Sequence, residues 1–136
     1  MNTGSNGNQA TLALIGRILL GAVFILSGLG KLGAPGPVQG YIAAVGLPAP
    51  LLAYVVALVV EVGGGALLLL GYRTKAVAAV LAAFCVLTAV IFHHALGDQD
   101  QFVHFMKDLA MAGGLLQIAA FGAGRIGLDS RSVARA

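Results

Sequence analysis

The stretch at residues 51–71 constrains this chain more than any other, because it is long enough to cross a bilayer and carries one charge, Glu61, near its centre. A membrane-spanning helix needs about 20 mostly apolar residues. A carboxylate at its midpoint costs roughly 2.5–3.5 kcal/mol on the insertion scale. The twelve Leu and Val residues of the stretch, at roughly 0.3–0.6 kcal/mol each, outweigh that cost. We therefore predict a membrane span whose carboxylate needs a partner.

The composition indicates a membrane protein. Of the 136 residues, 59% are hydrophobic and 10% are charged, which leaves too little polar surface for a soluble domain of this size. The eight Lys and Arg residues lie between hydrophobic runs and not in one basic patch, so we expect no nucleic-acid partner. The single cysteine, Cys85, excludes an intramolecular disulfide or a CxxC redox pair.

Four apolar runs divide the chain. We predict spans at about residues 12–32, 51–70, 76–95 and 103–121, inside a bundle that covers residues 11–122. Residues 1–10 are polar and predict a disordered tail, with Thr11 as a helix N-cap. Residues 123–136 form a basic tail. The loop at residues 33–50 holds all four prolines and leaves room for a short interfacial helix at residues 38–45.

The polar residues of the first span fall on one stripe of a helix. Arg17, Gly21, Phe24, Gly28 and Lys31 are spaced by 4, 3, 4 and 3 residues, so they share a narrow face. Glycines on such a face let neighbouring helices approach closely. Glu61 shares a face with glycines in the same way. The fold class that follows is an all-α membrane protein, an antiparallel four-helix transmembrane bundle.

Basic residues predict the orientation. The side of the membrane that holds both termini and the loop at residues 71–75 carries most of the positive charges, namely Arg73, Lys75, Arg125, Arg131 and Arg135. The positive-inside rule then places both termini in the cytoplasm of a bacterial cell, with the protein in the inner membrane.

The spacing of glycines and charged residues along this chain resembles the pattern of one protein family. The string Arg17-x-Leu19-Leu20-Gly21-x-x-Phe24-x-x-Ser27-Gly28-x-x-Lys31 resembles the DoxX family of small bacterial membrane proteins. Further strings agree with it, namely Gly46-Leu47-Pro48, Glu61-x-Gly63-Gly64, Phe92-His93 and Phe105-x-Lys107-x-Leu109-Ala110. Family members commonly carry Asn where this chain has Asp108. The resemblance implies a four-span bundle and, for function, a link of some members to quinone-dependent or other membrane-associated oxidoreductases.

Two sets of side chains compete as partners of Glu61. At 1.5 Å per residue, Arg17 and Glu61 lie about 8 Å and about 14 Å from the cytoplasmic ends of their spans, so depth alone permits a pair. Helical side chains lean toward their own N-terminus, however, which turns Arg17 and Glu61 apart. The same rule turns Lys31 and His93 toward the carboxylate, with Lys107 on the outer half of the fourth span. We therefore favour an outer cluster, with Arg17 as a side chain that snorkels to the cytosol.

This polar cluster has two interpretations. The charges could serve only to satisfy one another and fix helix register. Alternatively, two lysines and an imidazole around one acid offer hydrogen-bond donors to an anion or a quinone, and Glu61 and His93 could pass protons. The site residues that we predict are Glu61, Lys31, His93, Lys107 and Arg17.

A metal site has less support. The acidic and histidine side chains considered for it are His93, His94, His104, Asp98, Asp100 and Asp108. Adjacent His93 and His94 point about 100° apart on a helix, and no spacing matches a zinc pattern. We predict no metal.

The function predicted from the sequence is therefore that of a membrane component of a redox or quinone-linked complex, with no complete active site of its own and with oxidoreductase subunits as partners. Quinone is the candidate cofactor. A small solute transporter and a structural assembly scaffold are the alternatives. The sequence leaves open whether the chain is itself catalytic and whether it forms oligomers.

Overall fold

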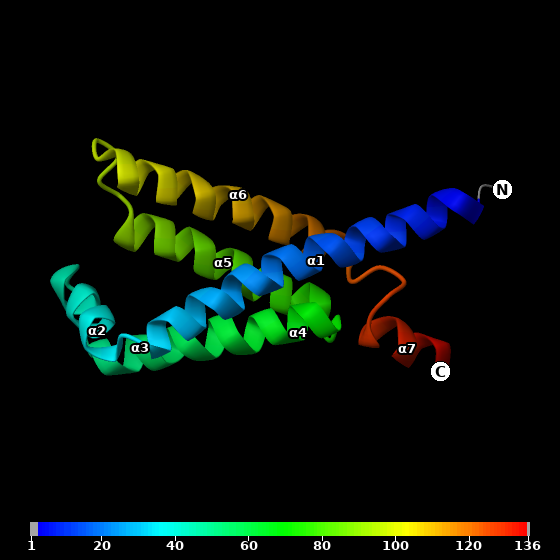
Figure 1. The fold of residues 1–136 in the computed structure, drawn as a ribbon, viewed down its shortest axis with the longest axis horizontal. Coiled ribbons are helices and arrows are strands. Elements are labelled where there is room, and N and C mark those ends of the chain that lie inside the picture. The colour runs from blue at the N-terminus through cyan, green and yellow to red at the C-terminus, as the bar shows by residue number, and fades with distance from the viewer. Residues whose placement is uncertain (1–2, 136) are drawn as a thin grey trace.

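The computed structural model describes residues 3–135, with side chains for residues 6–131. All regular secondary structure in this part of the chain is helical, which confirms the all-helical prediction. The helices are α1 (Thr3–Leu32), α2 (Pro35–Ala44), α3 (Pro50–Leu58), the π-helical turn η1 (Val59–Gly63), α4 (Gly64–Leu70), α5 (Thr74–Phe92), α6 (Gln99–Phe121) and α7 (Leu128–Arg135) (Figure 1).

Within the described part of the chain, three helical stretches are long and apolar enough to cross a membrane: Asn6–Leu32, Pro50–Leu70 and Thr74–Phe92. The second of these consists of α3, η1 and α4. The helix α6 is as long, but it carries Lys107 and Asp108 in its first half and is less apolar. Asp98 is its N-cap and accepts a hydrogen bond from the Gln101 N–H at 3.1 Å, so α6 begins before the predicted residue 103.

The two ends of the chain differ from the expected tails. The helix α1 begins at Thr3, so residues 3–10 are helical where a disordered tail was expected. Thr11 is not an N-cap, because its hydroxyl donates to the Gly7 carbonyl oxygen at 3.0 Å inside the helix. Once a helix exists, each added residue gains one hydrogen bond, which favours this extension. The basic tail contains α7. Met1, Asn2 and Ala136 lie outside the described residues, as does the Arg135 side chain.

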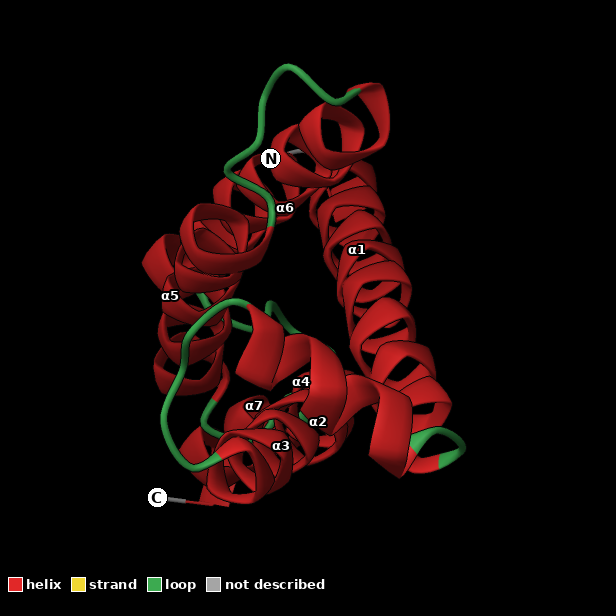
Figure 2. Ribbon diagram, turned by 90° about the vertical axis from the view of Figure 1, so that its left-hand side faces the viewer, coloured by secondary structure: helices red, strands yellow, loops and turns green. Residues whose placement is uncertain are grey.

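The long helices associate as two pairs. The first helix pair is α1 with α3, η1 and α4, and the second helix pair is α5 with α6. Figure 2 shows an open, wedge-like arrangement, with α1 on one side, α5 and α6 on the other, and α3 and α4 at the base. The pairs meet over a small buried core with residues from α1, α4, α5 and α6: Phe24, Leu68, Ala78, Leu81, Ala82, Cys85, Ala112 and Leu115.

Backbone contact between glycines closes the first helix pair. A Cβ atom added at Gly65 would lie 2.8 Å from the Gly21 carbonyl oxygen, and one added at Gly21 would lie 2.9 Å from the Gly65 carbonyl oxygen. A Cβ at Gly28 would lie 2.5 Å from the Val62 side chain. The predicted small-residue stripe of α1 therefore faces its neighbour, and the close approach depends on glycine.

Arg17 holds the far end of this pair. Its side chain is 1% exposed, and Nη1 donates to the carbonyl oxygens of Leu68 and Leu69 at 2.9 and 3.3 Å, while Nη2 donates to the Ile126 carbonyl oxygen. A cation is favoured at these carbonyls because they lie at the negative end of the α4 helix dipole, although the Leu68 carbonyl oxygen also accepts from the Gly71 N–H at 3.2 Å. Gly71 ends the helix with φ +68°, and a Cβ there would meet Arg17 Nη1 at 2.5 Å.

Asp129 fastens the tail to the start of α5. Its two carboxylate oxygens accept hydrogen bonds from the N–H groups of Arg73 and Thr74 at 2.7 and 2.9 Å, and its own N–H donates to the Gly71 carbonyl oxygen at 2.9 Å. Burial opposes ionisation, but the hydrogen bonds from Thr74 and Arg73, with the charge of Arg17, outweigh it and lower the pKa of Asp129. The carboxylate thus caps α5 from a distant part of the sequence.

Gly65→Ala tests the glycine contact. We expect it to lower the free energy of unfolding by about 1–3 kcal/mol, because the added methyl group meets backbone that cannot move without separating the helices. The control is Gly63→Ala two residues away, where a Cβ meets nothing within 4 Å. Denaturation of the purified protein in mixed micelles, followed by circular dichroism, measures both. Equal effects of the two substitutions would contradict the packing argument.

The pKa of Asp129 predicts a tail that is released by acid. Because folding lowers this pKa, its stabilising contribution is present above the ordinary value near 3.9 and disappears as the pH falls through the lower folded value. Hydrogen exchange of the Arg73 and Thr74 amides, corrected for intrinsic rates, should lose protection in that range. Asp129→Asn should weaken protection already at pH 7, whereas Asp100→Asn should not. Protection in Asp129→Asn equal to that of the unsubstituted chain would rule out the cap.

Candidate functional site

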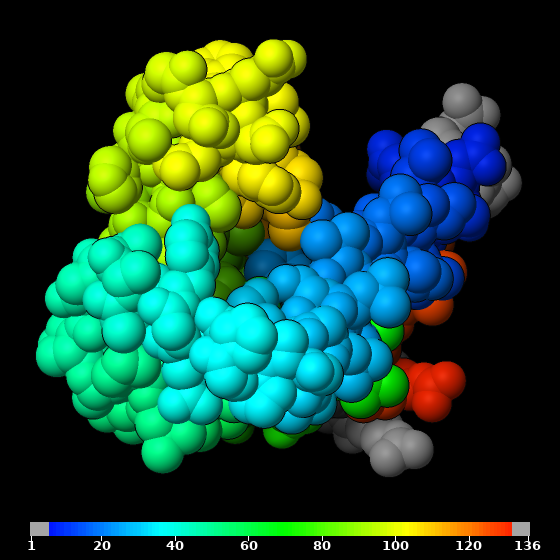
Figure 3. Space-filling model, turned by 60° about the vertical axis from the view of Figure 1, so that its left-hand side comes forward, coloured from blue at the N-terminus to red at the C-terminus, as the bar shows by residue number. Residues whose placement is uncertain are grey.

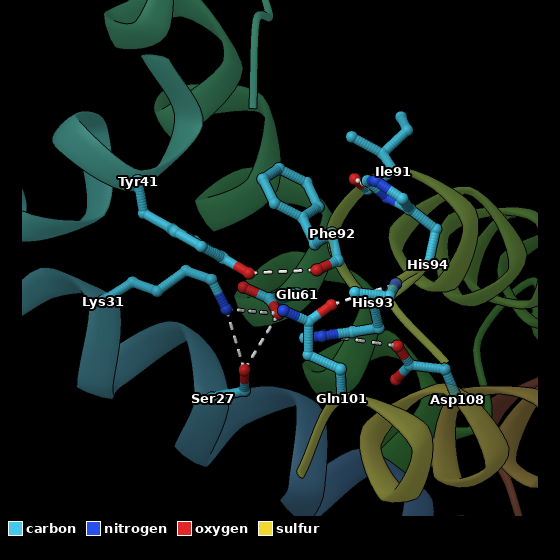
Figure 4. A network of polar contacts seen from close by, with 11 residues as sticks. Ser27, Lys31, Tyr41, Glu61, Ile91, Phe92, His93, His94, Gln101 and Asp108 are labelled. Atoms are coloured by element: carbon cyan, nitrogen blue, oxygen red, sulfur yellow. Dashed lines mark hydrogen bonds and ion pairs between the residues drawn. The ribbon is translucent and has the colours of Figure 1, made fainter. Parts of the chain in front are cut away.

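The Glu61 carboxylate lies inside the protein, on the π-helical turn η1. The residue is 4% exposed. Its Oε1 accepts hydrogen bonds from Lys31 Nζ at 2.8 Å and from the Ser27 hydroxyl at 2.9 Å, as Figure 4 shows. Its Oε2 is buried and has no hydrogen-bond partner among the described residues. A buried charge of this kind is stabilised only in part, since one oxygen still lacks a donor.

Lys31 is positioned by its own helix and by α3. Its ammonium donates to the Ser27 hydroxyl at 2.9 Å, one helical turn earlier, so Ser27 both accepts from Lys31 and donates to Glu61. The Tyr54 hydroxyl donates to the Lys31 carbonyl oxygen at 2.8 Å, which also accepts from the Ala34 N–H at 3.1 Å. These contacts hold the lysine over the carboxylate.

Two features of this arrangement were not predicted. The first is the role of Ser27, although its spacing of four residues from Lys31 puts both on one helix face. The second is the π-turn at η1, a departure from α-helix that is concentrated at functional sites. The β-branched residues Val59, Val60 and Val62, followed by three glycines, are the sequence signal for a weak α-helix at that point.

His93 turns toward α6. Its Nε2 lies 3.9 Å from Asp108 Oδ2, and its ring stacks on the His104 ring with centroids 5.0 Å apart. Burial lowers the pKa of His93, although the nearby Asp108 acts in the opposite direction. His94 points elsewhere, with Nδ1 3.0 Å from the Ile91 carbonyl oxygen. Among the described residues, no three His, Cys, Asp or Glu side chains converge on a metal-sized site.

The structure thus separates the predicted site residues into three groups. Glu61 and Lys31 form a direct ion pair. His93 and Lys107 line a cavity beside that pair, and Lys107 makes no hydrogen bond or ion pair with any described residue. Arg17 lies apart from Glu61, at the end of α4. It is buried on backbone carbonyls, so the expectation that it snorkels to the cytosol was wrong.

Two cavities meet at the ion pair. The apolar cavity, of about 390 Å³, lies between α2, α3 and α5 and is lined by Lys31, Val38, Tyr41, Ile42, Leu47, Ala53, Val56, Ala57, Glu61, Phe84, Leu87, Thr88, Ile91, Phe92 and His93. The polar cavity, of about 250 Å³, lies between α1, α5 and α6 and is lined by Val23, Phe24, Ser27, Lys31, Glu61, Phe84, Cys85, Thr88, His93, His104, Lys107, Asp108 and Met111. Figure 3 shows a hollow between the end of α1 and the start of α6.

The helix α2 closes one side of the apolar cavity. The Tyr41 hydroxyl donates to the Phe92 carbonyl oxygen at 3.0 Å, and the two rings lie 5.5 Å apart. Tyr41 therefore links α2, in the proline-rich segment, to the end of α5. The cavity is a concave, mostly apolar site with a charged group at one end, which is the usual form of a small-molecule site in a protein.

Comparisons with known proteins agree with the sequence pattern. The DoxX family model matches residues 12–94, more than half of the chain. The inner membrane protein YqjF of Escherichia coli is 37% identical over 116 residues, which cover 85% of this chain and 88% of the relative. The inner membrane protein YphA of the same organism is 39% identical over 129 residues, covering 90% and 91%. No solved structure matches the chain.

Substitutions of the ion pair should have unequal effects on stability. Lys31→Met leaves the buried carboxylate without its cation, and we expect it to cost about 2–3 kcal/mol, less than for a fully buried pair because Lys31 is partly exposed. Glu61→Gln should cost about 1 kcal/mol, since Lys31 can turn to water.

The double variant Lys31→Met/Glu61→Gln tests the coupling. It should be more stable than Lys31→Met alone, because it removes the unpaired charge. Unfolding in mixed micelles at pH 7 measures all three variants. Strict additivity of the two single effects would show that the pair is not coupled in the membrane protein.

Proposed function

This chain belongs to the DoxX family, and from that premise we propose that it is a multi-pass inner membrane protein that binds a quinone-type ligand as the membrane component of a redox complex. The observation on which this rests is a buried carboxylate oxygen without a donor, Glu61 Oε2, at one end of an apolar cavity. The two relatives named above are inner membrane proteins. Together with three membrane-length helices, they support the location.

The cavity suits a ring that carries oxygen atoms at its edge. Aliphatic and aromatic side chains line most of it, while Lys31 offers a donor and Glu61 an acceptor at one end. A quinone has only acceptor oxygens, whereas the corresponding quinol also carries O–H donors. Because Glu61 Oε2 lacks a donor, the site should prefer the reduced, hydroxyl-bearing form.

The fourth span completes the proposed membrane arrangement. The helix α6 has 23 residues, or about 34 Å at 1.5 Å per residue, enough to cross the hydrocarbon core. It packs along α5, and its charged residues Lys107 and Asp108 line the polar cavity. An antiparallel four-helix bundle follows, with both termini cytoplasmic because Arg73, Lys75 and Arg125 lie at that end.

Electron transfer in this proposal belongs to a partner subunit. The only cysteine is Cys85, so the chain cannot form a redox dithiol of its own. The Glu61 site would then hold the membrane-soluble carrier, and an oxidoreductase subunit would exchange electrons with it.

Binding of short-chain quinols to the protein in lipid nanodiscs tests the proposal. We expect decylubiquinol to bind more tightly than decylubiquinone. Glu61→Gln should weaken quinol binding about tenfold, since about 1.4 kcal/mol corresponds to a factor of ten and a charge-assisted hydrogen bond contributes about that much. The control is Leu70→Ala on the same helix, whose side chain is 55% exposed on the outer face.

Three results would contradict the proposal. They are the absence of saturable binding of either form, equal affinity for the two forms, and equal losses in Glu61→Gln and Leu70→Ala. Saturable uptake of a polar solute into proteoliposomes without quinol binding would instead favour a transporter. Stable folding with neither activity would favour a scaffold.

A further inference from the structure

The polar cavity contains a second buried oxygen without a donor. Asp108 Oδ2 has no hydrogen-bond partner among the described residues and lies 3.9 Å from His93 Nε2, beyond hydrogen-bond distance. Glu61 Oε2 has the same deficit, and both carboxylates line this cavity. Two unpartnered acceptors on one polar cavity need donors, because buried polar groups are almost always hydrogen-bonded.

Water is the donor that fits on this side of the carboxylates, and it supplies Glu61 Oε2 whenever no ligand hydroxyl reaches that oxygen from the apolar cavity, which Glu61 also lines. The volume of about 250 Å³ has room for several molecules, each of which occupies about 30 Å³ in the liquid. A buried water needs two to four polar partners, and Ser27, Lys31, Thr88 and His93 also line the space. At the other side of the cavity, His104 and Lys107 are exposed. The polar side chains therefore form a series from the buried Glu61 to the surface.

We propose that the polar cavity is a hydrated proton path, in which Asp108 and His93 exchange protons between Glu61 and the water at the α5–α6 end. Proton exchange with a bound ligand along this path rests on the proposed function. The path itself does not require a ligand. Titratable groups face it from every element around it: Lys31 from α1, Glu61 from η1, Cys85 and His93 from the α5 segment, and His104, Lys107 and Asp108 from α6.

The chemistry of each step is a proton transfer without any change of oxidation state. The Glu61 carboxylate first receives a proton, either along this path from bulk water or from a ligand hydroxyl. That proton then leaves for a water molecule and passes to the Asp108 carboxylate or to the His93 imidazole. It then reaches bulk water beside His104. A neutral imidazole can accept a proton on one ring nitrogen and release one from the other, which makes His93 suitable as a relay. No electron acceptor is needed for this exchange.

Thiol accessibility tests the hydration. In a Cys85→Ala background, Met111→Cys places a thiol on the polar cavity, and Leu116→Cys places one on the exposed apolar face of the same helix. A small water-soluble methanethiosulfonate reagent should modify Met111→Cys at least tenfold faster in liposomes, because a thiol that faces lipid does not ionise. A rate for Met111→Cys no higher than that for Leu116→Cys would overturn the proposal.

The relay itself is tested by infrared spectroscopy after a rapid pH jump, without ligand. The carboxyl band of Glu61 is identified by its loss in Glu61→Gln. We expect its response to slow at least tenfold in Asp108→Asn and in His93→Gln, and to keep its rate in Asp100→Asn, whose side chain lies outside both cavities. An unchanged rate in both cavity variants would refute the path even if quinol binds, whereas slowed exchange without quinol binding would refute only the proposed ligand.

Discussion

The structure depends on how a buried carboxylate is paired with donors between helices. Glu61 receives one ammonium and one hydroxyl, both from the last turns of α1, and both on the same oxygen. On antiparallel helices the side chains lean toward opposite ends, so Lys31 and Glu61 lean toward each other. The pair forms only if α1 and η1 are close, which the glycines at positions 21, 28 and 65 permit. The glycine packing and the ion pair therefore favour the same register of α1 against η1 and α4.

The opposite end of the first helix pair uses a cation in a different way. Arg17 also leans toward its own N-terminus, and there it meets the carbonyl oxygens that end α4. Its third acceptor, the Ile126 carbonyl, comes from the tail that follows α6. One guanidinium thus joins the first helix pair to the end of the second. Asp129 adds a further connection to α5, so this end of the molecule is held by several hydrogen bonds.

Some features of the structure could be predicted from sequence patterns, and others could not because they leave no pattern in the sequence. Periodicity and charge were enough to predict the four long helical stretches, though not α7, and, through side-chain direction, to favour Lys31 over Arg17 as the partner of Glu61. Arg17 was misjudged because its acceptors are backbone carbonyls, which leave no mark in a sequence pattern. Residues 3–10 were misjudged because composition describes an isolated segment, whereas this one continues an existing helix. The contact of His93 with Asp108 depends on a packing of α5 against α6 that periodicity does not fix.

Glu61 lies between two unlike cavities, which open to different surroundings. The apolar cavity reaches the outer surface of the helices beside Val56 and Leu87, which are 50% and 59% exposed. In a bilayer that surface meets lipid, so an apolar ligand can reach the carboxylate without crossing water. The polar cavity reaches the exposed His104 and Lys107 instead. Lys31, Glu61 and His93 line both spaces. In the proposed function, a single acid would therefore face a membrane-soluble ligand on one side and water on the other, which neither cavity alone provides.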